Sequence, residues 1–462
     1  MMGRFAGKAY SCFPEWGCTV FRGAARFANF AGRVETGGSV LSLMRAIVGF
    51  FLLFSASLLA EDTGLLNRDM PQWLRLGAQM RLRSEGEHGI GYVEGNDHDY
   101  LLQRYRFSVG IRPITGVQFF GEVQDARAAW LPNQGGGIKD RLDLRQAWVG
   151  IGTENKLWDL RVGRQRLAFG SERVIGASEW GNTARVFDAA RLALHRGHDR
   201  VDIFASSVVA ADTDHWDHHQ QGNNLHGAYA SIGSLIPGSQ FEPYVLFRTN
   251  HNAGGLHTWT EGVRSAGAVH KEWRYEAELI KQTGSVGVRH LSAWAGTMQG
   301  QRLLRTLRWQ PTLMAEGNYA TGDKNPKDAV VNTFDQLYPT NHGIYGIADQ
   351  VGRRNNKNLR GGVWLHPEKW LTLKTEMHSF WLVSRYDSLY AFNGSTLVPA
   401  VAGGASSTDV GRELDLLSEV KLSRHYDIGL QYGHMFPGEF LKTYTPGAGH
   451  SFYAVYFDLR LQ

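Results

Sequence analysis

Residues 73–85 read WLRLGAQMRLRSE, and this stretch decides the fold class. Its apolar side chains fall on one parity and its three arginines on the other, a period of two residues that predicts a β-strand with two unlike faces. The polar face holds Arg75, Arg81 and Arg83. Burying unpaired charge costs too much free energy for these arginines to be packed dry. That face must therefore meet water or opposite charge.

The same alternation recurs along the chain. Further runs occupy residues 104–112, 312–319, 359–366, 371–378, 413–421 and 455–461. Clusters rich in Gly, Asn and Pro, such as 132–137, 250–255, 321–328 and 393–407, separate the runs and predict turns and loops. No amphipathic helix of any length stands out. The sequence therefore predicts an all-β fold.

The first 60 residues differ from the rest. Residues 45–60 read RAIVGFFLLFSASLLA, in which one arginine precedes an apolar run and then small residues. This order is typical of a secretory signal peptide, and the apolar run is shorter than the roughly 20 residues that a spanning helix needs. We predict a leader at 1–60, with translation starting at Met44 and the signal peptide at 44–60, followed by one domain at 61–462. A genuine longer leader is the alternative.

Charge and cysteine content exclude several classes of function. The chain has 49 basic and 44 acidic residues, of which residues 1–60 hold six and two. The remaining 43 and 42 nearly balance, so the high sequence pI is no evidence for nucleic-acid binding. Both cysteines, Cys12 and Cys18, also lie in the leader. The domain therefore has neither a disulfide nor a thiol nucleophile, and core packing or sheet closure must stabilise it.

Two all-β architectures show such alternation. A soluble barrel or sandwich turns its apolar face inward, whereas a transmembrane barrel turns it towards lipid and keeps a wet lumen. An export signal, the absence of cysteine from the domain and the charge on the polar face favour the membrane. At about 22 residues per strand and connection, a domain of this length forms about 16–18 strands. We therefore expect a transmembrane antiparallel β-barrel of about 16–18 strands in the cell outer membrane.

Two segments differ from the strand pattern. In residues 161–191 the apolar parity changes at Gly163, which predicts a β-bulge there. Charges beside small residues follow and predict a segment folded into the lumen, with most charges paired: Arg164, Arg166, Glu172, Arg173, Glu179, Arg185, Asp188 and Arg191. Residues 318–355, rich in Asn, Asp and Gly with embedded aromatics, predict a long ordered loop.

These two segments resemble the alginate export family of outer-membrane proteins. The motifs that carry the resemblance are GRQ (163–165), FGSER (169–173), WGNTARVFD (180–188) and, within 322–349, GDKNP and TFDQLYPTNHGIYGIAD. The similarity extends over roughly residues 72–460. It implies an outer-membrane barrel lined by basic residues, which in alginate-secreting members passes an anionic polysaccharide outward. Many relatives occur where no alginate is known, so the resemblance says less about the substrate than about the fold.

Residues and resemblance together lead us to expect a channel for an anionic substrate, a uronate-type polysaccharide, with no cofactor, metal or catalytic residue. Arginine forks bind carboxylates with two hydrogen bonds, and rings of basic residues select anions in pores. The candidate substrate-binding residues are Arg75, Arg81, Arg83, Arg104, Arg106, Arg164, Arg166, Arg173, Arg185 and Asp188. For each arginine a structural salt bridge is an equal alternative. The expected partners are outer-membrane lipid and an anionic polysaccharide or oligosaccharide, with periplasmic export components as candidates and no nucleic acid.

The sequence leaves two alternative functions open. One is a general porin for anions or oligosaccharides, which shares the fold. The other is an outer-membrane hydrolase, although the sequence has neither a G-x-S-x-G nor an H-E-x-x-H motif. The HWDHH run at 215–219 and His378 near Glu376 could serve such chemistry, but we interpret the run as a solvated loop. The TGDKNPKD stretch at 321–328 has oxygen ligands at Asp323, Asn325 and Asp328 but lacks the Gly and closing Glu of an EF-hand. We interpret it as a turn, with a loop-stabilising calcium ion as the alternative.

Overall fold

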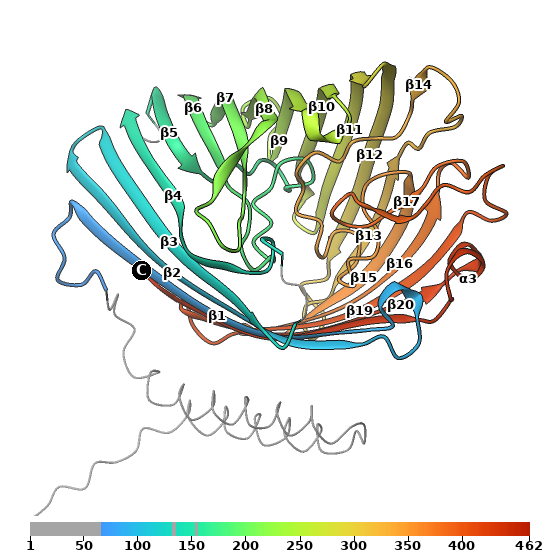
Figure 1. Ribbon diagram of the computed structural model, residues 1–462. Coiled ribbons are helices and arrows are strands. Elements are labelled where there is room, and N and C mark those ends of the chain that lie inside the picture. The colour runs from blue at the N-terminus through green and yellow to red at the C-terminus, as the bar shows by residue number, and fades with distance from the viewer. Residues whose placement is uncertain (1–65, 132–134, 153–155) are drawn as a thin grey trace, which may run out of the picture. The chain divides into compact units, whose positions relative to one another are not determined.

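The computed structural model describes residues 66–131, 135–152 and 156–462 (Figure 1). Within this part of the chain, 18 antiparallel strands form one closed barrel. The barrel strands are β1 (Leu74–His88), β2 (His98–Ile114), β3 (Val117–Ala129), β4 (Asp140–Gly152), β5 (Trp158–Gln165), β6 (Phe187–Arg196), β7 (Asp199–Ala210), β8 (His218–Ile232), β9 (Ser239–Asn250), β10 (Leu256–His270), β11 (Trp273–Val286), β12 (Arg289–Leu303), β13 (Thr312–Ala320), β15 (Asn356–Glu368), β16 (Leu371–Leu382), β19 (Asp409–Lys421), β20 (Tyr426–Pro437) and β21 (His450–Leu461). The predicted leader lies outside the described residues and stays a prediction.

Closure comes from the pairing of the first strand with the last. β1 pairs with β2 on one side and with β21 on the other, where Arg81 lies opposite Asp458. The strand count confirms the expected 16–18 strands. The remaining elements are short: β14 (Val330–Val331), β17 (Leu389–Tyr390), β18 (Thr396–Val398), the 3-10 helices η1 (Ile90–Tyr92) and η2 (His251–Ala253), and the helix α3 (Glu439–Tyr444). No helix among the described residues is long and apolar enough to cross a membrane.

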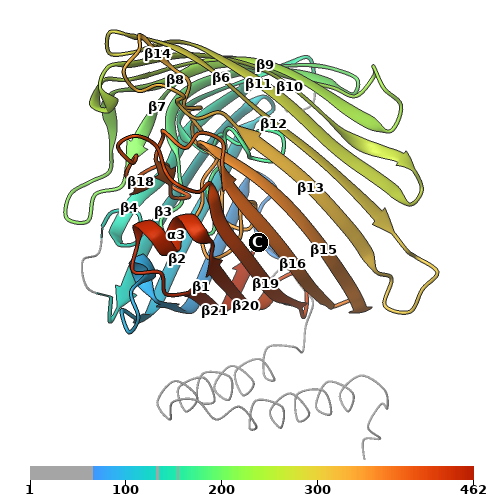
Figure 2. The same ribbon diagram turned by 90° about the vertical axis from the view of Figure 1, so that its right-hand side faces the viewer.

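The two ends of the barrel carry connections of different length. Tight turns, such as residues 115–116 and 197–198, lie at the end where β1 begins and β21 ends. The longest connections lie at the other end, which in outer-membrane barrels faces the cell exterior. Two of them, residues 166–186 and 321–355, fold back inside the barrel (Figures 1 and 2). We call them the first and second lumen segments.

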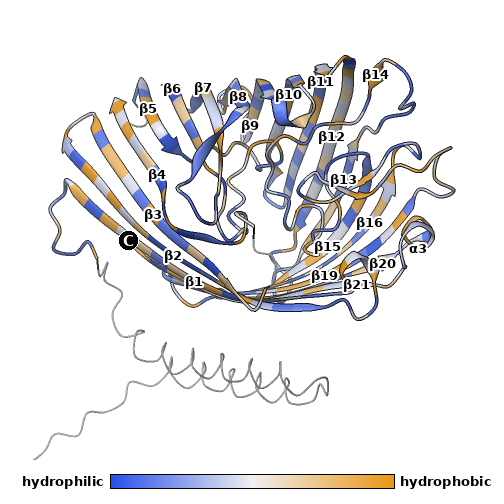
Figure 3. Ribbon diagram, in the orientation of Figure 1, coloured by the Kyte–Doolittle hydropathy of each residue, from blue (hydrophilic) through white to orange (hydrophobic). Residues whose placement is uncertain are grey.

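The barrel wall is apolar outside and charged inside. In β2, Tyr105 and Phe107 are 42% and 46% exposed, whereas Arg104, which precedes Tyr105 and lies on the opposite face, is 2% exposed. The same alternation of hydrophobic and hydrophilic residues runs along the other strands (Figure 3). A soluble protein would place these faces the other way round. The outer face therefore meets lipid and the inner face lines a polar lumen.

The prediction of a β-bulge at Gly163 is wrong. β5 pairs without a register shift across this residue, with Trp148 of β4 on one side and Ala189 of β6 on the other. The apolar parity changes because the strand ends at Gln165 and the first lumen segment begins. Gly163 itself has φ +127°, and a Cβ atom there would lie 2.2 Å from the Ala147 carbonyl oxygen, so the close approach of β4 requires glycine.

Apolar packing fixes both lumen segments to the wall and to each other. Val174 and Ile175 of the first segment and Phe334 and Leu337 of the second are buried in one cluster with wall residues such as Phe204. Ile175 also forms a parallel β-bridge with Tyr338. The expected long ordered loop at 318–355 is thus confirmed, with its first three residues belonging to β13. The lumen contains an ordered structure rather than loosely tethered loops.

Adjacent residues near the middle of β12 test the assignment of the two faces. Met298 is 73% exposed on the outer face and Gln299 points inward, where it donates to Glu316. We expect Met298→Arg to reduce the free energy of unfolding in lipid vesicles by about 2–4 kcal/mol, because the guanidinium would face hydrocarbon. Gln299→Arg should cost far less, since it adds the same charge beside a carboxylate. Urea titration in vesicles measures both, and equal costs would contradict the assignment.

Candidate functional site

Arginines of the wall bind the backbone of the first lumen segment. Arg81, Arg83 and Arg104 are at most 5% exposed and project inward from β1 and β2. Their guanidinium groups donate to the carbonyl oxygens of residues 179–181 over 2.5–3.1 Å. Irregular backbone in a buried position needs such donors, because its carbonyls have no partners in a sheet or helix. These three arginines therefore anchor the segment instead of presenting free guanidinium groups to a substrate.

The side-chain carboxylate of Glu179 contacts the guanidinium groups of four arginines. Its oxygens lie 2.8 Å from Arg106, 2.6 Å from Arg145, 3.4 Å from Arg166 and 3.7 Å from Arg104. Burial alone would raise the pKa of Glu179, but these arginines, Arg106 first, lower it well below its ordinary value of 4.5. The carboxylate is therefore ionised at neutral pH and offsets part of the surrounding positive charge.

Trp180 links the two lumen segments. The Arg83 guanidinium lies 4.0 Å from the centre of the Trp180 ring on one side, and the His342 ring of the second segment stacks at 4.1 Å. His342 is held in turn by Asp349, 2.9 Å from its Nδ1. The indole therefore packs between a wall arginine and the second segment, which couples the positions of both segments to β1.

Arg185 fastens the segments together from within the first one. Its Nη1 donates to the carbonyl oxygens of Gly176, Tyr338 and Pro339, at 2.7–3.1 Å. Burial lowers the pKa of Arg185 to about 10, which still leaves it charged at neutral pH. Like the wall arginines, Arg185 uses its donors on backbone and acts as a structural cross-link.

The remaining paired candidates form salt bridges. Arg173 is buried against Glu276 and Glu316, with its Nη2 2.7 Å from the latter. Arg164 and Asp188 pair with each other at 2.8 Å across β5 and β6. The expectation that most charges of residues 161–191 are paired structurally is confirmed by these contacts. Their partners leave them little capacity for a ligand.

A basic cavity lies between the first lumen segment and the ends of β1 and β21. Its volume is about 480 Å³, and its charged lining consists of Arg81, Arg104, Arg106, Arg166, Arg460, Glu122, Glu179 and Asp458. Five arginines face three acidic side chains there. Arg166 and Arg460 have the most open side chains, 45% and 51% exposed. We call this cavity the vestibule, since it lies towards the end of the barrel with short turns.

The vestibule brings together only part of the predicted set. Arg81, Arg104, Arg106 and Arg166 line it, whereas Arg75 is exposed near the short turns, where it donates to nearby backbone carbonyls. The other candidates lie elsewhere in the lumen: Arg83, Arg164, Arg173, Arg185 and Asp188.

Sequence reasoning missed two residues of the vestibule and one arginine that contacts its acidic side chains. Arg460 and its partner Asp458 stand on the polar face of the last strand, and that parity could have identified them. Arg145 of β4 is buried between Glu122 and Glu179 and shares its parity with Asp143. The contacts of these residues depend on which strands and segments become neighbours in the barrel. The alternation of apolar and polar residues does not reveal those neighbours.

Two other sequence features lie wholly or partly in loops. Within 321–328, Asp323 accepts from Arg289 at 2.8 Å, and the backbone turns through bonds among its own residues. His215 of the 215–219 run is exposed at 82% of its side chain, and His218 and His219 are exposed as well. The first observation agrees with the interpretation of a turn. The 215–219 run is a solvated loop only as far as residue 217, because His218 and His219 begin β8.

Comparison with known proteins supports the assignment of the chain as an outer-membrane β-barrel. The alginate export family matches residues 72–455, while no curated protein matches the chain. Among solved structures, OccD3 of Pseudomonas aeruginosa is similar, with 11% identity and a TM-score of 0.60 over 84% of this chain and 91% of that one. OccAB1 of Acinetobacter baumannii has 11% identity and a TM-score of 0.57 over 84% and 96%. At such identity these structures bear on the fold alone. Family and fold place the protein in the outer membrane and point to a channel rather than an enzyme.

Glu179→Gln tests the charge balance of the vestibule. The variant removes the carboxylate that four arginines share and keeps the side-chain size. We expect the anion/cation permeability ratio, measured from reversal potentials at neutral pH, to rise about fivefold, the effect of about 1 kcal/mol of electrostatic free energy. An unchanged ratio would show that Glu179 does not set the field in the vestibule.

The same carboxylate predicts a pH dependence. The pKa of Glu179 is lowered in the folded protein. The stabilisation from its ion pairs with the arginines is therefore complete above pH about 4.5 and is lost as the pH falls through the lowered pKa. The wild-type permeability ratio should therefore stay constant from neutral pH down to about pH 5 and approach that of Glu179→Gln only in stronger acid. A midpoint near pH 6 would contradict the arrangement.

Proposed function

This chain belongs to the alginate export family of outer-membrane barrels, and from that premise we propose that it passes a uronate-type anionic polysaccharide through its arginine-lined lumen. The substrate would cross the outer membrane without any bond being made or broken. Periplasmic export components are candidate partners at the end of the barrel with short turns. The vestibule is the part of the lumen on which the proposal rests.

The excess of arginine over acid in the vestibule is the observation that supports the proposal. Guanidinium groups bind carboxylates through two parallel hydrogen bonds, and a uronate chain carries one carboxylate on each sugar. Arg166 and Arg460 are the residues with exposed guanidinium groups for this contact. Glu179 and Asp458 pair with the same two arginines, so each contact is weak enough for release, as passage through a channel requires.

A second candidate is a porin for small anions or oligosaccharides. The observation that favours it is the filling of the lumen by two packed segments, together with a vestibule of about 480 Å³, a size usual for small-ligand sites. Both candidates require anion selectivity. They differ in whether a long polyuronate enters the channel.

Single-channel recording separates the two candidates. The full-length protein, purified from outer membranes, is inserted into planar bilayers and titrated with polyuronate of defined length. We expect anion-selective currents that polyuronate blocks. Arg166→Ala and Arg460→Ala should each weaken the block about fivefold, as expected for the loss of one partly solvated charged hydrogen bond.

Arg308→Ala is the matched control. Arg308 is exposed in the connection 304–311, where it lies over the Trp309 ring, and it does not line the vestibule. The variant removes the same charge and should leave the block unchanged. An equal effect in all three variants would contradict a role for the vestibule, and anion currents that polyuronate does not block would favour the small-anion porin.

A further inference from the structure

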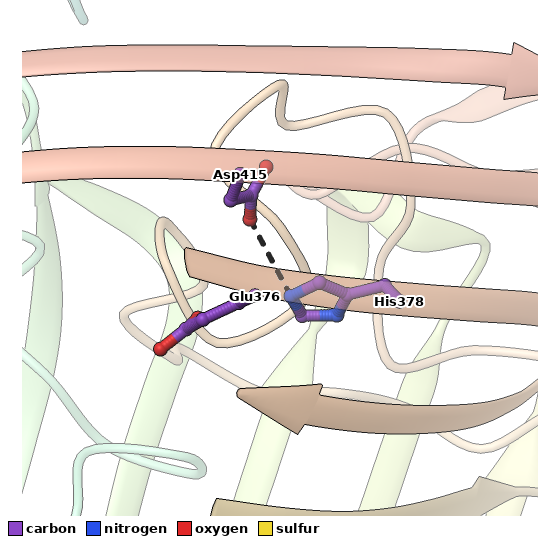
Figure 4. Close-up of side chains that lie close together, drawn as sticks. All are labelled: Glu376, His378 and Asp415. Atoms are coloured by element: carbon purple, nitrogen blue, oxygen red, sulfur yellow. Dashed lines mark ion pairs between the residues drawn. The ribbon is translucent and has the colours of Figure 1, made fainter. Parts of the chain in front are cut away.

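Four titratable side chains form a buried square on the inner face of β16 and β19. In the register of these strands Glu376 lies opposite Asp415, and His378 lies opposite Glu413. All four are at most 3% exposed. Figure 4 shows His378 and Asp415 facing each other across the two strands, with Glu376 beside them. None of these residues lines the vestibule.

The square carries more negative charge than its neighbours balance. Glu376 is neutralised by Arg360, whose Nε lies 3.0 Å away, and it also accepts from Trp364 Nε1 at 2.7 Å. Among the described residues, the cationic contact of Asp415 is with His378 alone, at 3.4 Å, and Glu413 forms no ion pair. Two buried carboxylates therefore share at most one positive charge. Such an imbalance is costly unless a proton or another cation compensates it.

Unpartnered polar atoms converge on the same place. The His378 Nε2, Asp415 Oδ1 and Glu413 Oε2 atoms are buried in the described structure and form no hydrogen bond, although Nε2 lies 3.4 Å from Asp415 Oδ2. Ligand atoms of Glu376, His378 and Asp415 lie within 4.8 Å of one another. An imidazole nitrogen and carboxylate oxygens at this separation form a donor set that small shifts of the side chains would close around one ion.

We propose that this square binds one divalent transition-metal ion, with Zn²⁺ as the best match. The ligands are His378 Nε2 and carboxylate oxygens of Asp415 and Glu376, and Glu413 supplies the further negative charge. Imidazole favours zinc and its neighbours over Mg²⁺ and Ca²⁺, and carboxylates complete tetrahedral zinc sites.

The ion would fasten the second lumen segment to the wall. The Ala348 amide donates to Glu413 Oε1 at 2.8 Å, and the Ile347 amide donates to Asp415 Oδ2 at 3.3 Å. Gly346 has φ +87°, and a Cβ atom there would collide with the Glu413 carboxylate, so the segment fits closely against this group. By neutralising both carboxylates, the metal removes the repulsion between the groups that hold the segment.

Metal titration of the full-length protein tests the proposal. The detergent-purified barrel is stripped with a chelator and titrated with Co²⁺, whose visible absorption reports its ligands, and then with Zn²⁺. We expect one Co²⁺ per chain, displaced by one equivalent of Zn²⁺. His378→Gln and the near-isosteric Asp415→Asn should weaken Zn²⁺ binding about 100-fold. Loss of a residue that only orients a ligand costs up to about 100-fold in metal affinity, and loss of a ligand should cost no less.

His215→Gln is the control for adventitious binding by the exposed 215–219 run and should leave the stoichiometry and affinity unchanged. Gel mobility before and after heating verifies that each variant is a folded barrel. The proposal is overturned if stripped wild-type protein binds no stoichiometric ion. It is also overturned if His215→Gln abolishes binding while His378→Gln retains it. These readouts do not depend on transport, so they are independent of the proposed substrate.

Discussion

The guanidinium–carbonyl contacts between the wall and residues 179–181 are the interaction on which the lumen depends. A barrel strand satisfies its own backbone through its neighbours, but an irregular segment inside a barrel has no such partners. Arginine offers five donors in a rigid fork and stays charged, so a few side chains from β1 and β2 can satisfy several carbonyls at once. These contacts fix the position of Trp180. Because Trp180 stacks on His342, they also help to position the second lumen segment.

Carboxylates neutralise many of the arginines that project into the lumen. Glu179 contacts four arginines, and carboxylates from distant strands hold the others, as Glu316 holds Arg173. Many of the charged residues that the structure describes are thus paired locally. Positive charge in excess of these pairs remains where arginines outnumber acids, at the vestibule. The described part of the lumen is thus largely a network of salt bridges, and the vestibule is a place where arginines outnumber acidic side chains.

The alternation in residues 73–85 was enough to predict both the strand and the inward direction of Arg81 and Arg83, because strand parity is a local property. It could not predict that these arginines bind backbone carbonyls, since the acceptor of Arg81 lies 98 positions along the chain. The bulge expected at Gly163 failed for a related reason: a change of parity marks the end of a strand as well as a bulge. Likewise, His378 and Glu413 are far apart in the sequence, and only the register between β16 and β19 places them opposite each other. The square could therefore not be predicted from the sequence.

Hydrogen exchange shows whether the wall arginines hold the first lumen segment in place. In the purified barrel, amides of residues 172–183 are compared with amides of the neighbouring wall strands β1 and β2. If the wall arginines and the packed core hold the segment in the lumen, its buried amides should exchange at rates close to those of the strands, because both open only when the barrel unfolds locally. Exchange within seconds, as in a solvated loop, would contradict the account.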